Sequence, residues 1–110
     1  MHIHYISEQN SILNHFLAQI RDVNIQNDSM RFRKNIERIG EIMAYELSKT
    51  LDYKEIDVQT PLGIKHTTTI AEPVVLCSIL RAGLALHQGF MSFFDNAENG
   101  FVSAYRHHYD

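Results

Sequence analysis

Two arginines occupy the positions of this chain where ligand chemistry is most readily placed. Arg81 directly follows an apolar run from Pro73 to Leu80, and Arg106 follows a second, shorter apolar run. If these runs are neighbouring parallel strands, both arginines lie outside the carboxyl ends of the strands, where open α/β sheets bind ligands. Ala82 and Gly83 are small enough to let backbone N–H groups approach an anion at a helix start. The pattern indicates a phosphate or pyrophosphate site; an arginine here is also commonly a solvated turn residue, and the residues alone leave both interpretations open.

The elements that must position these arginines are a strand, a helix and a second strand. The run from Pro73 to Leu80 has strand length and predicts burial on both faces. Apolar residues at helical spacing follow from Leu84 to Phe94, and a polar loop then leads to a short strand over 101–105. Residues 73–106 thus predict one βαβ unit whose two strands end at the same edge of the sheet. Cys77, in the middle of the first strand, is expected to carry a buried, unreactive thiol.

The N-terminal half predicts two amphipathic helices within residues 10–50. Asn10 and Ser11 precede the first helical stripe, and residues 27–29 offer a second start signal. The second helix opens with a basic group, Arg31, Arg33, Lys34 and Arg38, interleaved with two glutamates. We interpret this group as a solvated helix face rather than as a partner or nucleotide contact, since ion pairs at such spacing are common and weak.

Residues 54–70 alternate between polar and apolar side chains and predict a protruding β-hairpin arm. Thr60-Pro61-Leu62-Gly63 supplies the proline and glycine that a turn prefers. An isolated two-stranded hairpin is marginal in water, so we expect the arm to dock on another subunit and to build a homodimer or a larger assembly. An ordinary surface hairpin is the alternative.

Composition sets the class of protein. A chain of 110 residues with 45% hydrophobic and 21% charged residues is typical of one globular domain. Ten basic against 13 acidic residues disfavour nucleic-acid binding. One cysteine, no basic leader and no apolar stretch of membrane-spanning length predict a cytoplasmic protein without membrane contact. We interpret His107 and His108, together with His2 and His4, as chain-end residues rather than metal ligands.

The order of several motifs resembles the uracil phosphoribosyltransferase family over nearly the whole chain. The segment from Ser78 to Leu84 is similar to the pyrophosphate-binding loop of these enzymes. Around it lie, in the family's order, a helix with Ile39-Gly40 and Met43-Ala44-Tyr45-Glu46, the arm with its turn at 60–63, and a strand ending in Ala104-Tyr105-Arg106.

The resemblance implies a fold, a reaction and a set of binding residues. Residues 1–110 would be the N-terminal part of a single phosphoribosyltransferase domain, with the first βαβ unit of its parallel sheet. The implied glycosyltransferase reaction of pyrimidine salvage converts uracil and phosphoribosyl pyrophosphate to UMP and pyrophosphate, with Mg²⁺ assisting and GTP as an activator. Arg81, Ala82, Gly83 and Arg106 match positions that hold phosphoribosyl pyrophosphate; no catalytic acid or base and no metal ligand is assigned.

Two segments typical of the family are not found in these 110 residues: the loop that cradles the ribose 5-phosphate and the region that recognises uracil. We therefore expect the chain to be inactive alone.

Two other functions fit the same residues. One is a non-catalytic regulator that senses a nucleotide through Arg81 and Arg106, and the other is a structural fragment whose sheet edge pairs with another chain.

Overall fold

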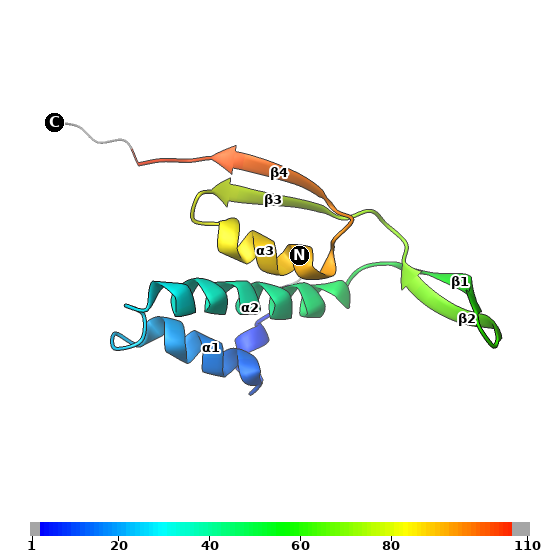
Figure 1. The fold of residues 1–110 in the computed structure, drawn as a ribbon, viewed down its shortest axis with the longest axis horizontal. Helices are drawn as coiled ribbons and strands as arrows, with labels where there is room; N and C mark the ends of the chain where they lie inside the picture. The colour runs from blue at the N-terminus through cyan, green and yellow to red at the C-terminus, as the bar shows by residue number, and fades with distance from the viewer. Residues whose placement is uncertain (1–2, 107–110) are drawn as a thin grey trace.

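A computed structural model describes residues 3–106 as a mixed α/β structure with three α-helices, an antiparallel hairpin and a parallel strand pair (Figure 1). The order is η1 (Ile6–Glu8, a 3₁₀ turn), α1 (Ile12–Arg21), α2 (Ser29–Ser48), β1 (Tyr53–Thr60), β2 (Gly63–Ile70), β3 (Val75–Leu80), α3 (Leu84–Phe93) and β4 (Glu98–Ser103). His2, His107 and His108 lie outside the described residues. No helix within residues 3–106 is both long and apolar enough to cross a membrane.

The body of the molecule is built in layers. β3 and β4 pair in parallel, α3 lies against one side of this pair, α2 lies on the other side of α3, and α1 packs on α2 (Figure 1). The predicted strand–helix–strand order is confirmed, but the prediction that the second strand starts at Phe101 is wrong. β4 starts at Glu98, because Glu98, Asn99 and Gly100 pair with Val75, Leu76 and Cys77 despite their turn-like composition.

Two glycines let α2 and α3 approach until their backbones touch. A Cβ atom added to Gly89 would lie 2.1 Å from the carbonyl oxygen of Glu37, and one added to Gly40 would lie 2.6 Å from that of Leu86. Both glycines are buried. Gly40 costs helix propensity, and the close crossing explains why it stands in the middle of α2. The crossing fixes where α3 begins relative to α2.

A buried polar contact joins α1 to α2. Asn35 is fully buried, and its side-chain amide donates to Gln19 Oε1 at 2.8 Å. Asn35 Oδ1 accepts from the Arg38 guanidinium at 3.1 Å, and this guanidinium lies 5.3 Å from the centroid of the Phe16 ring. Because of these contacts, Arg38 is a packing residue and not part of a solvated face.

The predicted start signals of α1 and α2 act as helix caps, since Ser11 and Asp28 accept hydrogen bonds from first-turn amides.

The sheet is covered on only one face by the described residues, which corrects the prediction that the first strand is buried on both. Along β3, exposure alternates: Leu76, Ser78 and Leu80 are half-buried on the α3 side, whereas Val75 and Ile79 are 64% and 60% exposed. Cys77 belongs to the exposed set, so the expectation of a buried thiol is also wrong. We call the side with Val75, Cys77 and Ile79 the open face.

The hairpin projects away from the body (Figure 1). β1 and β2 pair over their full length, from Tyr53 opposite Ile70 to Thr60 opposite Gly63, and most of their residues are exposed. Gly63 has a φ of +134°, a conformation that favours glycine, so the tight turn needs this residue. The predicted arm is present. Its docking on another subunit stays a prediction.

Candidate functional site

The connection from β3 to α3 is the short loop Arg81–Ala82–Gly83 that the sequence singled out. The loop is closed by two backbone hydrogen bonds, from Gly83 N–H to the Ile79 carbonyl at 2.9 Å and from Leu84 N–H to the Arg81 carbonyl at 3.1 Å. The Leu80–Arg81 peptide bond is cis. A Cβ atom at Gly83 would lie 2.7 Å from the Ile79 carbonyl oxygen, so this tight return requires glycine.

The loop ends at the N-terminus of α3, with Gly83 as the N-cap residue. No side chain of the described residues caps this helix end. Helix N-termini carry partial positive charge and unpartnered N–H groups, which favour anions. The loop therefore places the Arg81 guanidinium next to a helix start that favours negative charge.

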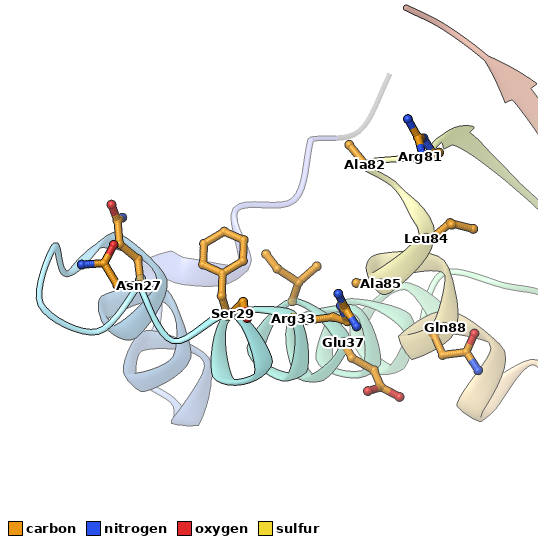
Figure 2. Close-up of a pocket in the computed structure, with 12 residues that line it drawn as sticks. Asn27, Ser29, Arg33, Glu37, Arg81, Ala82, Leu84, Ala85 and Gln88 are labelled. Atoms are coloured by element: carbon orange, nitrogen blue, oxygen red, sulfur yellow. The ribbon is translucent and has the colours of Figure 1, made fainter.

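Arg81 and Ala82 line an open cavity of about 980 Å³ (Figure 2). Its opposite wall is the first half of α2 and the connection before it, which contribute polar side chains that include Ser29, Arg33 and Glu37. Both walls also contribute apolar residues: Phe32 and Ile36 from α2, and Leu84 and Ala85 from α3. The cavity can therefore hold a ligand that has both a charged and an apolar part. Gly83 does not line it.

The charges around the cavity favour an anion. Arg33 and Arg81 contribute two guanidinium groups, and within residues 3–106 neither has a carboxylate oxygen within 4.0 Å. Glu37 contributes the one carboxylate of the lining, and its charge is partly compensated because Lys34 Nζ lies 3.3 Å from its Oε2. The sequence interpretation of Arg33 as part of a solvated face missed this location. The signal was the four-residue spacing of Ser29, Arg33 and Glu37, which places them on one side of α2.

Arg106 does not line the cavity. It is exposed and follows β4 at the same edge of the sheet as Arg81, because β3 and β4 are parallel and Leu80 pairs with Ser103. The chain turns back into α3 directly after Arg81, whereas Arg106 comes three residues beyond the last paired position. That the two guanidinium groups hold one ligand together stays a prediction.

A helix-connected pair of parallel strands with a tight, glycine-containing loop after the first strand is a mixed α/β arrangement, and open α/β sheets bind ligands at this edge. Comparison with known proteins identifies the family within this class. Residues 6–110 match the sequence profile of the family described as uracil phosphoribosyltransferase. The chain belongs to the uracil phosphoribosyltransferase family, which confirms the resemblance seen in its motifs.

Similar proteins named uracil phosphoribosyltransferase occur in bacteria and archaea. The protein of Porphyromonas gingivalis (strain ATCC 33277) is 50% identical over 110 residues, which are 100% of this chain and 51% of the relative. The protein of Sulfolobus acidocaldarius is 42% identical over 98 residues, 86% of this chain and 44% of the relative. The chain thus spans about half the length of the curated relatives it matches.

A solved structure has a similar fold over most of this chain. It is described as the AQ2163 protein from Aquifex aeolicus, and it superimposes with a TM-score of 0.68 at 28% sequence identity. The match covers 84% of this chain and 44% of that chain. The matched region is less than half of that longer chain.

Proposed function

We propose that this chain provides the phosphoribosyl pyrophosphate-binding part of a uracil phosphoribosyltransferase, a glycosyltransferase of pyrimidine salvage. Family membership supports the class. The observation that carries the proposal is the Arg81–Ala82–Gly83 loop, which is tightly closed at an uncapped helix start beside a cavity with a second arginine. In this proposal β3, α3 and β4 are the first βαβ unit of a phosphoribosyltransferase-type sheet, within one domain that includes residues 1–110.

The proposed reaction breaks the bond between the anomeric carbon of the ribose and a pyrophosphate oxygen. A uracil nitrogen forms the new bond to that carbon and gives up its proton, so that UMP, pyrophosphate and a proton are released. Negative charge develops on the leaving oxygens as the bond breaks. Fixed guanidinium and backbone N–H groups stabilise such charge most when they are held in place beforehand. Arg81 would act as an electrostatic clamp and not as an acid, because a guanidinium does not give up its proton in proteins. Ala82, Gly83 and Arg106 complete the proposed binding set.

Mg²⁺ enters this proposal with the substrate. Within residues 3–106, no three side chains of His, Cys, Asp or Glu come together in a way that could hold a metal ion. Mg²⁺ commonly keeps several waters and binds through substrate phosphates rather than in an all-protein cage. The described residues therefore offer no dedicated metal site, and no step of the reaction is assigned to one.

The activity of the whole enzyme needs more than this chain provides in the proposal. We infer that the 110 residues alone bind pyrophosphate but do not convert uracil to UMP, since one βαβ unit leaves the ribose and the base unenclosed. Formation of UMP by the purified chain from uracil, phosphoribosyl pyrophosphate and Mg²⁺ would contradict this inference. Assembly through the hairpin, activation by GTP and a cytoplasmic location belong to the same proposal.

Calorimetric titration with pyrophosphate and Mg²⁺ tests the binding role of Arg81. We expect Arg81→Ala to weaken binding about tenfold or more, because a charge-assisted contact contributes about 1.5–3 kcal/mol. Arg21→Ala is the matched control, since Arg21 is exposed at the end of α1 and lies outside the cavity lining. No heat from the unmodified chain at millimolar pyrophosphate, or equal weakening by both substitutions, would overturn the proposal.

A further inference from the structure

His87 lies in the first turn of α3 and joins three elements through its side chain. Its ring is only 5% exposed. Nδ1 lies 2.5 Å from Ser78 Oγ on β3, and Nε2 lies 2.8 Å from Asn99 Oδ1 on β4. The ring also packs against Phe101, with 4.9 Å between the ring centroids. One imidazole thus holds the helix to both strands.

Both ring nitrogens of His87 have a hydrogen-bond partner. The side-chain amide of Asn99 donates to the Ala97 carbonyl at 3.3 Å, so the oxygen of Asn99 faces the ring and accepts from Nε2. Nδ1 is partnered by the Ser78 hydroxyl, which can donate or accept. A buried polar side chain requires such partners.

The side chain of His87 contacts the chain just before the Arg81–Ala82–Gly83 loop, because it bonds Ser78, three residues before Arg81. Ser78 is followed by Ile79, whose carbonyl accepts from Gly83 N–H at 2.9 Å and closes the loop. On the other side of the loop, the His87 N–H donates to the Gly83 carbonyl at 2.9 Å, the ordinary first-turn bond of α3 that does not depend on the imidazole. The contribution of the His87 side chain is therefore made at the end of β3.

The order of a hydroxyl, a histidine and a polar third side chain resembles that of hydrolytic triads. Here it does not form a nucleophile, because the Ser78 hydroxyl contacts the buried ring on the α3 side of the sheet and none of the three residues lines the cavity beside Arg81. A nucleophile must reach its substrate. The contacts fit a role in holding the backbone instead.

We propose that His87 is a positioning residue for the Arg81–Ala82–Gly83 loop, acting through Ser78 on β3 and Asn99 on β4; the inference rests on the anion-binding function proposed for that loop. Without the imidazole, the hydroxyl of Ser78 and the oxygen of Asn99 lose their partner, and the end of β3 is released from α3. The N–H groups and the guanidinium of the loop are then less well aimed at an anion, which lowers affinity.

Two variants separate positioning from general stability. His87→Phe keeps an aromatic ring but removes both hydrogen bonds of the side chain, whereas Phe90→Leu alters a half-buried residue one turn further along α3. Under conditions in which both are folded, we expect His87→Phe to speed hydrogen exchange of the Gly83 amide about tenfold and to weaken pyrophosphate binding about tenfold. Phe90→Leu should change neither relative to the unmodified chain, even if it lowers the melting temperature as much.

Ser78→Ala is the milder second variant if His87→Phe does not fold. It removes the hydroxyl that contacts His87 Nδ1. We expect faster exchange of the Gly83 amide and weaker pyrophosphate binding, each at about a third or more of the effect expected for His87→Phe. If the unmodified chain fails to bind pyrophosphate, the proposed function of the loop fails, while Gly83 exchange still decides whether His87 holds it. Equal exchange rates in all variants, or equal losses of affinity in His87→Phe and Phe90→Leu, would overturn the positioning role.

Discussion

Arg33 is the residue whose location adds most to the site, because it lines the same cavity as Arg81 from α2, the opposite wall (Figure 2). We expect Arg33→Gln to weaken pyrophosphate binding about threefold to tenfold, since a second guanidinium in the same cavity adds attraction without being part of the loop. Arg31→Gln is the control: Arg31 lies two residues earlier on α2, pairs with Asp28 at 3.8 Å and does not line the cavity. Calorimetry that finds the two variants alike would remove Arg33 from the site.

The carboxyl groups of Asp52 and Glu72 meet where the hairpin joins the body, beside the hydrogen bond from Ala71 N–H to the Asp52 carbonyl. The side-chain hydrogen bond with Asp52 raises the pKa of Glu72 above its usual 4.5, and repulsion by the Asp52 charge adds to this. The folded state therefore holds this proton more tightly than the unfolded state does.

The sign of the pH dependence follows from that shift. As pH rises from about 4.5 through the raised pKa of Glu72, the folded chain loses a proton that the unfolded chain has already lost, so this group lowers stability. We expect Glu72→Gln to remove that contribution. Denaturant unfolding of both proteins between pH 4 and pH 7 measures it as a difference, and a difference that does not vary with pH would contradict the assignment.

At the scale of elements, the contact between α2 and α3 is the one least tolerant of change. Gly89→Ala gains about 1 kcal/mol of helix propensity, but its Cβ would lie 2.1 Å from the Glu37 carbonyl oxygen, and backbone cannot yield cheaply. Overpacking costs about 1–3 kcal/mol or more, and a contact this short belongs at the upper end. We expect a net loss of about 2 kcal/mol in unfolding free energy.

Gly100→Ala is the matched control for this prediction. Gly100 lies in β4, where an added Cβ would have its nearest neighbour, Cys77 Sγ, at 3.8 Å, an ordinary contact. We expect a change within about 0.5 kcal/mol. Urea unfolding monitored by circular dichroism compares the two, and similar losses would show that the α2–α3 crossing has room for a methyl group.

The elements were predictable from sequence to the extent that local patterns determine them. The period of apolar residues predicted the helices, and alternation with a Pro-Gly turn predicted the hairpin, because both depend on near neighbours. The early start of β4 was not predictable, since Asn99 and Gly100 are turn residues by propensity and pair only because β3 lies beside them. The same limit applies to the candidate site: position after a strand singled out Arg81, Ala82 and Gly83, whereas Arg33 reaches the cavity through packing of α2 against α3.

The whole molecule is extended, with dimensions of 65 × 33 × 32 Å and a radius of gyration of 17.9 Å. A compact domain of about 100 residues has a radius of gyration of about 13 Å. The projecting hairpin accounts for much of the difference (Figure 1). A two-stranded hairpin that buries so little of itself is marginally stable on its own in water, which supports its proposed role in assembly.

Removing the arm tests that role at the scale of the assembly. The ends of the arm are adjacent, since Ala71 N–H donates to the Asp52 carbonyl at 2.8 Å, so a Gly-Gly link in place of residues 53–70 leaves the body intact. We expect the shortened chain to keep the helical signal in circular dichroism. The particle mass measured by light scattering should fall from that of an oligomer to that of a monomer. An unmodified chain that is already monomeric, or a shortened chain of unchanged oligomeric state, would refute docking through the arm.

Because exposure alternates along β3, its cysteine is accessible to labelling reagents. Cys77 is the only cysteine of the chain, and its sulfur stands in the middle of the open face between Val75 and Ile79. A single fluorophore attached by maleimide chemistry would therefore label that surface and nothing else. A polypeptide that covers the open face would shield the sulfur of Cys77. The rate at which Cys77 is alkylated therefore measures how completely the open face is covered.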